Sequence, residues 1–362
     1  MKTGDVILPL HNGRAPDWLL ERMVKLSRSI LYIMALEFGK EEVLRRLSDP
    51  VWFQSLGCLL GFDWHSSGLT TTVTFALKRA LKDIGSEIGI FAAGGKGKYA
   101  IKTPDELRDN AFKVGFNADS LIYASRLAAK VDSCLLQDGY ELYHHSIFYT
   151  REGLWCIVQQ GMNVMNRKAR RYHWLSERVL SFVEEPHSGI VAEKKEKEVL
   201  DLTAKISKDA REVILQLSRK PPDEVIKLYI KALSYNLPQR HYITLKDIRP
   251  ENLKKVLIQT YSNPPHDFET LTLSRGLGPM SFRALALISD VIYGAKPSYQ
   301  DPVLYSFAHG GKDGYPYRVR KDLYDKSIEV LEKAIKAAKL GSREELMVLR
   351  KLTTLFGPYK TP

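Results

Sequence analysis

Most of the chain has the periodicity of amphipathic helices, in which an apolar residue recurs at every third or fourth position. In the segment 18–47 these residues form one stripe, with charged residues opposite: Leu19, Met23, Leu26, Ile30 and Met34. A second helix is predicted to start at Pro50, because Ser48 and Asp49 are suited to the positions before a helix. The same periodicity predicts helices over 70–81, 105–130, 192–218, 223–233 and 324–339.

A different pattern, typical of β-structure, covers 134–163. Turn residues at 138–139 and 150–153 separate runs rich in aromatic and β-branched residues, which predicts an antiparallel hairpin. A short strand is also predicted to end at Phe91. Because side chains alternate along a strand, Glu141, Tyr143 and His145 share one face, whereas His144 lies on the other. The two histidines therefore cannot bind one metal ion together, and at most one of them serves a site.

These patterns predict an α+β protein that is mostly helical. Neither the helical nor the strand periodicity continues through 183–188, and this interruption predicts a domain boundary. We expect an N-terminal α+β domain, 1–188, with a small antiparallel hairpin or sheet. A helical domain, 189–362, should follow and contain a helix-hairpin-helix at 267–302.

Charge favours a polyanionic partner. Among 362 residues, 54 Lys and Arg face 42 Asp and Glu, which gives a net charge of +12. Such an excess suits nucleic acid, and DNA is the partner we expect. The hydrophobic content of 44% is enough for real cores, so disorder is not expected.

The cysteine spacing and the hydropathy argue against a cysteine-ligated metal site and against a membrane span. Cys58, Cys134 and Cys156 are far apart and form no CxxC pair, so we expect neither a zinc ribbon nor an iron–sulfur cluster. The simplest interpretation is a reducing compartment. No apolar run approaches the ~20 residues that span a membrane, and we expect a soluble, cytoplasmic protein without a membrane partner.

Several basic stretches are candidates for contacts with the DNA backbone. A glycine-rich loop at 94–98 carries Lys96 and Lys98 but lacks the Walker A spacing, and a plain hairpin turn is the alternative. The run 166–174 mixes cations with aromatic residues, which can pair phosphates and stack bases. Its alternative is a solvated helix face. The candidate cations are Arg167, Lys168, Arg170 and Arg171, with Lys312 in the irregular stretch 305–322; the candidate base-stacking residues are Trp64, Tyr143 and Trp174.

Two sets of polar residues are candidates for a catalytic site. The loop 62–68 places Asp63 and His65 beside two serines, although such residues also cap helices and form turns. The hairpin region could gather a second group, for which a solvated hairpin is the alternative: Asp132, Asp138, Glu141, His145, Gln159 and Gln160.

The segment 267–301 reads as a short helix, a Gly276-Leu277-Gly278-Pro279 turn, a longer apolar helix and a loop that ends in an acid. Glycines permit positive φ and remove side chains that would block another backbone. Free N–H groups at the following helix start form an anion site, and Pro279 suits the first helical position. The predicted DNA contacts are Gly276, Gly278, Pro279, Ser281 and Arg283. The alternative is an ordinary helical pair in a core.

The turn resembles the helix-hairpin-helix family of non-sequence-specific DNA binders. The order of turn, helix, Gly/Pro loop and Asp301 further resembles the DNA glycosylases of that superfamily. That resemblance implies base excision, in which a base is flipped out and Asp301 stabilises an oxocarbenium ion or activates water. No cofactor would be required. Met280 stands where bifunctional members carry a lysine, so lyase chemistry is not implied. The alternative role for Asp301 is that of a turn acid or helix cap.

Over its whole length the chain resembles an archaeal and bacterial domain-of-unknown-function family, the one numbered 763. Four stretches carry this resemblance: LPLHNGRAPDWLLERM, RLSDPVWFQSLGCLLGFDWHSSG, VQQGMN with ARRYHW, and FAHGGKDGYP. The family implies no activity.

Two other functions remain open beside the glycosylase. A nuclease would place Asp63, Asp132 and Glu141 around Mg²⁺ or Mn²⁺, with the hairpin holding DNA. No D…ExK signature supports that grouping. A non-catalytic DNA-binding or scaffold protein needs only the charge and the hairpin.

Overall fold

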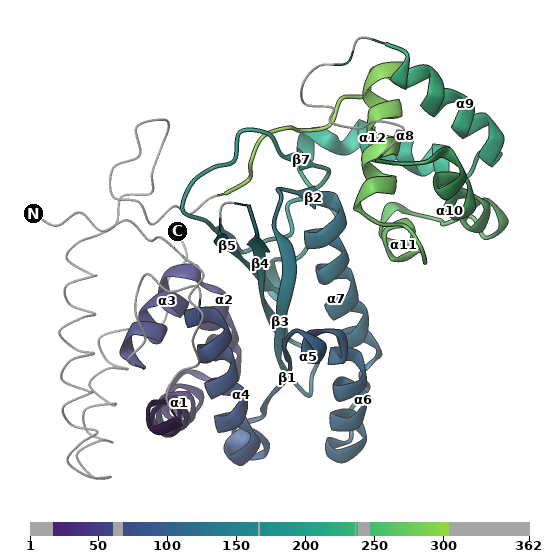
Figure 1. The fold of residues 1–362 in the computed structure, drawn as a ribbon. Helices are drawn as coiled ribbons and strands as arrows, with labels where there is room; N and C mark the ends of the chain where they lie inside the picture. The colour runs from purple at the N-terminus through teal and green to yellow at the C-terminus, as the bar shows by residue number, and fades with distance from the viewer. Residues whose placement is uncertain (1–16, 61–67, 166, 236, 238–246, 304–362) are drawn as a thin grey trace, which may run out of the picture.

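The computed structural model describes residues 17–60, 68–165, 167–235, 237 and 247–303 (Figure 1). The predicted helix at 324–339 and the candidates Asp63, Trp64, His65 and Lys312 lie outside these residues. The described fold is α+β and mostly helical, as predicted.

A five-stranded antiparallel sheet lies at the centre, in the order β1-β3-β4-β5-β6. Its strands are β1 (Ile90–Lys96), β3 (Glu141–Thr150), β4 (Trp155–Asn163), β5 (Lys168–Leu175) and β6 (Gly189–Val191). Two further short strands pair with each other, β2 (Leu136–Gln137) and β7 (Leu200–Asp201). The predicted hairpin is therefore present as β3 and β4, within a larger sheet.

Four helices cover one face of the sheet: α1 (Asp17–Phe38), α2 (Lys40–Ser48), α3 (Pro50–Leu59) and α4 (Gly68–Ile88). The Asp49 side chain caps α3 by accepting from the N–H groups of Val51 and Trp52, as the sequence predicts. Gly39, at φ 85°, separates α1 from α2 and breaks the single helix predicted over 18–47. Apolar side chains of these helices pack against Phe148, Val158 and Leu175 of the strands.

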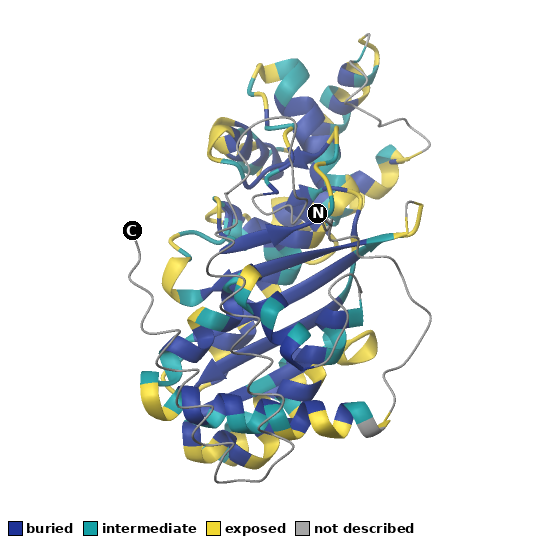
Figure 2. Cartoon of the chain, turned by 90° about the vertical axis from the view of Figure 1, so that its left-hand side faces the viewer, coloured by how far each residue is buried: buried dark blue, intermediate teal, exposed yellow. Residues whose placement is uncertain are grey.

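The opposite face is covered by α5 (Lys98–Ile101), α6 (Thr103–Val114), α7 (Asp119–Lys130) and the single π-helical turn η1 (Val131–Leu135). Gly115 ends α6 in the left-handed conformation and divides the helix predicted over 105–130. Because both faces are covered, the strands are buried over most of their length, whereas the helices expose their outer sides (Figure 2).

A helical unit completes the described chain. It contains η3 (Lys205–Ser207), α8 (Lys208–Ser218), α9 (Pro222–Leu233), α10 (Pro250–Ser262), α11 (Phe268–Leu273) and α12 (Pro279–Tyr293); a short turn η2 (Ser176–Arg178) follows β5 earlier in the chain. Helix α12 packs against α8, α9 and η1, so one hydrophobic core continues from the sheet into this unit.

Two segment predictions and the predicted domain boundary differ from the structure. The run 166–174 contains a central strand rather than a solvated helix face, because both sides of β5 pack into the protein. The segment 192–218 is irregular before η3, apart from the short strand β7, and α-helical only from Lys208. Strand β6 pairs with β5 beyond residue 188, so the predicted boundary falls inside the sheet, and the helical unit begins after β7.

Candidate functional site

The turn between α11 and α12 is the strongest candidate for contact with a ligand. Asp267 caps α11 by accepting from the N–H of Thr270 at 2.7 Å. Gly276 has a φ of +83°, in the region that favours glycine, and Gly278 precedes α12 in extended conformation. An added Cβ at Gly278 would meet no heavy atom within 4 Å, so this side of the turn is open.

The turn is held in place by polar contacts with the sheet-bearing unit. Lys130 Nζ donates to the carbonyl oxygen of Leu277 at 2.6 Å, and Gln137 Nε2 donates to that of Pro279 at 2.7 Å. Arg283 Nε in turn donates to Gln137 Oε1 at 2.8 Å. Two cations thus lie at the base of the turn, and the surface backbone is fixed to the core.

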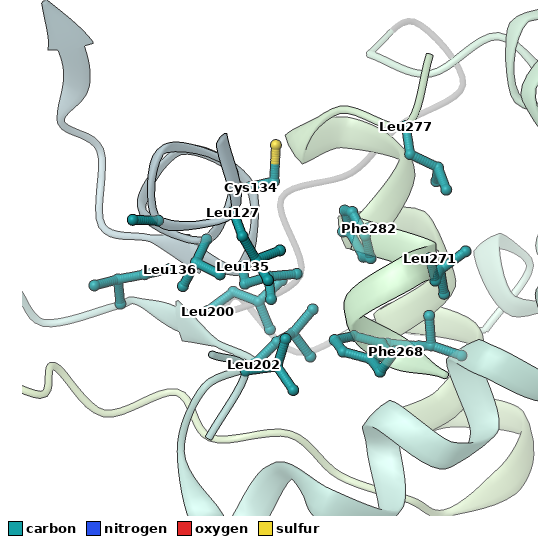
Figure 3. Close-up of a cluster of buried hydrophobic side chains, with 14 of the residues drawn as sticks. Leu127, Cys134, Leu135, Leu136, Leu200, Leu202, Phe268, Leu271, Leu277 and Phe282 are labelled. Carbon is teal, nitrogen blue, oxygen red and sulfur yellow. The ribbon is translucent and has the colours of Figure 1, made fainter. Parts of the chain in front are cut away.

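Apolar contacts reinforce this attachment (Figure 3). Leu277, at the tip of the turn, is 1% exposed and points into the cluster with Phe282 and Leu271. Leu135 and Leu136, from η1 and β2, lie on the other side of the same cluster. The turn therefore buries its leucine and presents Arg275, Gly276, Pro279 and Met280 to solvent.

Asp301 lies in a buried ion-pair cluster around Arg170. The guanidinium donates to Asp301 Oδ1 at 3.1 Å and Oδ2 at 2.6 Å, and to Asp138 Oδ2 at 2.9 Å. Asp301 also accepts from the N–H groups of Glu196 and Val303. Burial alone would lower the pKa of Arg170, but the charges of Asp138 and Asp301 raise it above its ordinary value. Both oxygens of Asp301 are therefore held, and this geometry gives no support to a catalytic role.

A second buried cluster surrounds Asp132 on the same face of the sheet. Its Oδ2 accepts from Gln159 Nε2 at 2.5 Å and from Trp174 Nε1 at 3.0 Å, while Oδ1 lies 2.5 Å from His187 Nε2. Gln159 Oε1 lies 2.8 Å from His145 Nδ1. Of the six residues expected to gather in the hairpin region, Asp132, His145 and Gln159 lie together here, whereas Asp138 contacts Arg170, Glu141 is exposed and Gln160 contacts Tyr143. Asp132, His145 and Gln159 are buried, and the polar groups of their cluster are satisfied by one another.

A comparison with known protein families identifies the chain at the level of the family. The family described as "Protein of unknown function (DUF763)" matches residues 4–319. The chain belongs to this family. Comparisons with curated proteins and with solved structures gave no match. The family assignment confirms the full-length resemblance, whereas the helix-hairpin-helix resemblance stays a prediction.

In this DUF763 chain, three of the residues predicted to contact DNA are buried. Arg170, Arg171 and Trp174 are 0% exposed, because β5 is covered on both faces. A side chain without solvent access cannot contact a DNA backbone or stack a base, so these predictions are wrong. Tyr143 is largely buried as well, and its hydroxyl accepts a hydrogen bond from Gln160 Nε2.

The other candidate cations lie at the surface. Lys96 and Lys98 are exposed at the end of β1 and the start of α5. Arg167 is exposed before β5 at φ 56°, and Lys168 Nζ pairs with Glu193 Oε2 at 2.7 Å. These four lie around the sheet, not beside the turn before α12.

Of the acids of the nuclease hypothesis, Asp63 lies outside the described residues, and Asp132 and Glu141 differ in their surroundings. Asp132 is fully buried, whereas Glu141 is exposed at the start of β3. In the part of the chain that the structure describes, no three His, Cys, Asp or Glu side chains form a group that could hold a metal ion. The same part contains no helix long and apolar enough to cross a membrane.

Sequence reasoning missed two residues of the buried clusters. His187 was not singled out, because it lies where the periodic pattern lapses and no spacing links it to Asp132. Tyr172, whose hydroxyl donates to Asp138 Oδ2 at 2.7 Å, carried no signal beyond its neighbours Arg170 and Arg171. The pairing of Arg170 with Asp301 likewise joins residues 131 positions apart.

Buried histidines predict that the folded state loses stability in acid. Burial lowers the pKa of His144 to about 3, and lowers the pKa of His145 and His173 below their ordinary value of 6.5. Below about pH 6.5 the unfolded chain therefore binds more protons at these histidines than the folded chain does. The free energy of unfolding decreases as the pH is lowered. Asp138 opposes this effect, because burial raises its pKa to about 6. We expect the effect of the three histidines to exceed that of Asp138. His144 alone should lower the free energy of unfolding by about 2 kcal/mol between pH 7 and pH 5.

Urea unfolding of His144→Gln at these two pH values checks this expectation. The variant should lose less stability on acidification than the wild type. Equal acid sensitivity in wild type and His144→Gln would contradict the assignment.

Proposed function

We propose that this protein binds DNA in DNA processing and holds a strand's phosphates at the turn between α11 and α12. The observation that carries the proposal is this turn itself: Gly276 is exposed and Gly278 is partly exposed, and the 15-residue helix α12 follows directly. The first N–H groups of a helix have no partner within it, and the helix dipole makes that end positive. Both properties favour a phosphate.

Charge and rigidity support the same proposal. Arg275 is exposed on the turn, and Lys130 and Arg283 lie partly buried at its base. Because the apolar cluster and the two carbonyl contacts fix the turn, little ordering entropy would be lost on binding. A backbone-to-phosphate contact carries no sequence information, so we expect binding to any duplex of sufficient length.

The proposal extends to DNA repair, with a DNA glycosylase as the lead activity. Asp301 provides no support for that activity in its present contacts, and a metal-dependent nuclease and a non-catalytic scaffold therefore remain outcomes of the test. The proposal of DNA binding does not depend on which of these holds.

The experiment is a panel of labelled duplexes, undamaged or carrying one modified base each, incubated with the full chain with and without EDTA. Excision from a modified duplex in EDTA would identify a glycosylase. Metal-dependent cleavage of undamaged DNA would identify a nuclease. Binding without a product would identify a scaffold protein, and absence of binding to every duplex at low salt would contradict the proposed function.

Salt dependence gives a further expected result. If the turn and its cations neutralise phosphates, the logarithm of the binding constant should fall linearly with the logarithm of the salt concentration. Arg275→Gln should reduce the slope by about one, the contribution of one phosphate contact. Fluorescence anisotropy over a salt series measures this slope. Arg178→Gln, an exposed arginine next to β5, is the control and should leave it unchanged. Equal slopes for Arg275→Gln and wild type would remove Arg275 from the interface.

A further inference from the structure

A basic surface surrounds an exposed tyrosine where the edge strand β1 ends and the short helix α5 begins (Figure 1). Tyr99 is 57% exposed, and the lysines that precede and follow it are exposed as well: Lys96, Lys98 and Lys102. Lys96 and Lys98 are DNA contacts predicted from the sequence, and the structure adds Tyr99 and Lys102 to them. We call these four residues the Tyr99 patch.

The backbone brings the residues of the patch together on α5. The N–H of Lys102 donates to the carbonyl oxygen of Lys98 at 3.2 Å, so these two lysines lie one helical turn apart and on the same side. Tyr99 and Lys102 are three positions apart, and residues at this spacing are also neighbours on a helix. Lys98 Nζ lies 5.6 Å from the centre of the Tyr99 ring. The exposed ring is therefore bordered by positive charge.

The positive charge of the patch is not compensated within the part of the chain that the structure describes. None of its three lysines forms an ion pair there, and the first two acids of α6 are paired with other cations. Glu106 lies 2.6 Å from Lys78 Nζ, and Asp105 lies 3.0 Å from Arg108 Nη1. A group of lysines without counter-charges attracts a polyanion.

Hydrogen bonds and a close approach hold the backbone of the patch in place. Gly97 N–H donates to the carbonyl oxygen of Tyr143 in β3 at 2.8 Å. Thr103 follows α5, is 0% exposed, and donates from its hydroxyl to a carbonyl oxygen of α5 at 2.7 Å. At Gly95, an added Cβ would lie 3.2 Å from the Cβ of Tyr99, so the glycine lets Tyr99 lie against the strand. Because the tyrosine stands on a fixed backbone, little ordering entropy would be lost when a ligand stacks on it.

We propose that the Tyr99 patch binds single-stranded DNA, with one base stacked on the Tyr99 ring and the flanking phosphates on the lysines. Proteins that hold single strands without reading their sequence combine aromatic side chains with a positively charged path. In a duplex the bases are already stacked on one another, so a single strand offers the ring a free base face and a duplex does not.

This inference rests on the proposed function for the class of partner, DNA, and adds a second contact that is separate from the turn before α12. The turn contacts phosphates only, and a duplex presents these as well as a single strand does. The Tyr99 patch needs an unstacked base. The two surfaces together suit a DNA that has both a duplex part and a single-stranded part.

Fluorescence anisotropy of the full chain with a labelled oligothymidylate at low salt tests the patch. Tyr99→Ala should bind at least about fivefold more weakly than the wild type, the loss expected for one stacked base. Tyr99→Phe keeps the ring and should bind as the wild type does. Tyr235→Ala, which replaces a 48% exposed tyrosine after α9, is the control and should also leave the affinity unchanged. Equal affinity of a folded Tyr99→Ala and the wild type would overturn the proposal.

The lysines give a second, independent measurement. Lys98→Gln and Lys102→Gln should each reduce the slope of the logarithm of the binding constant against the logarithm of the salt concentration by about 0.7, the contribution of one phosphate of a single strand. Lys113→Gln, an exposed lysine near the end of α6, is the control. The proposal fails if neither lysine variant changes the slope. It also fails if polyglutamate displaces the labelled strand as effectively as unlabelled oligothymidylate does, because the patch would then serve an acidic protein.

A blunt duplex of the same length separates this inference from the proposed function. Tyr99→Ala should bind the duplex as the wild type does, and Gly278→Val should bind the single strand as the wild type does. A wild type that binds the duplex but not the single strand would overturn the role of the Tyr99 patch and leave the proposed function intact. Tyr99-dependent binding of the single strand without any binding of the duplex would support the patch and contradict the proposed function.

Discussion

Replacing Arg170 with methionine should lower the free energy of unfolding by about 3–5 kcal/mol, the cost of breaking a buried ion pair by removing one partner. Arg170 is 0% exposed and holds the carboxylates of Asp138 and Asp301 at distances of 2.6–3.1 Å. Without the guanidinium, two buried carboxylates would face each other unpaired. Urea unfolding of wild type and Arg170→Met at neutral pH measures the loss.

Combining Arg170→Met with Asp138→Asn and Asp301→Asn provides the internal check. The triple variant removes the unpaired charges, and we expect it to recover a large part of the lost stability. Arg178→Met, an exposed arginine, should change stability by less than about 0.5 kcal/mol. A folded Arg170→Met as stable as the wild type would contradict the structural role assigned to Asp301 and Arg170.

Replacing Phe282 with alanine should cost about 3–5 kcal/mol, because it opens a cavity where α12 meets the rest of the core. Phe282 is 0% exposed and its ring lies 5.9 Å from that of Phe268, edge to face. Met280 is the matched control: it lies on the same helix two residues earlier and is 39% exposed. Met280→Ala should be nearly neutral in urea unfolding. Equal effects of the two substitutions would contradict the attachment of α12 through this cluster.

Local sequence signals predicted several parts of the fold correctly. Asp49 and Asp267 cap the helices that follow them, because their carboxylates accept from the free N–H groups there. The alternation in β3 placed His144 and His145 on opposite faces, and the structure confirms this. His144 contacts Thr74 of α4, and His145 contacts Ser125 of α7.

Strand β5 shows where local sequence patterns fail to predict burial. A strand covered on both faces has no solvent side, so the apolar–polar alternation that reveals a strand is lost. Arg170 and Arg171 look like surface residues in sequence, yet each is buried on its own face. The acid that compensates Arg170 is Asp301, far along the chain, and no local pattern could indicate it.

Two smaller errors have similar causes. The charged segment 192–201 has helical spacing, but it is irregular and ends in β7 because tertiary contacts hold it: Glu196 N–H donates to Asp301, and β7 pairs with β2. Tyr143 was placed on the face of His145. The pairing of β3 with β4 is irregular between Leu142 and His144, and the Tyr143 hydroxyl accepts from Gln160 on the opposite face.

The substitution Gly278→Val tests the central claim, that the turn before α12 holds DNA. Gly278 has extended backbone, at φ −119° and ψ −179°, and a Cβ added there meets no heavy atom within 4 Å. Valine should therefore leave thermal unfolding nearly unchanged while blocking the approach of a strand. Ser120→Val, an exposed substitution on α7, is the matched control.

The decisive measurement is the affinity of these proteins for a labelled duplex at low salt, by fluorescence anisotropy. We expect Gly278→Val to bind at least about tenfold more weakly than the wild type, a loss of about 1.4 kcal/mol. Ser120→Val should bind as the wild type does. Equal affinity of a folded Gly278→Val and the wild type would contradict the claim that this turn is the DNA-binding site.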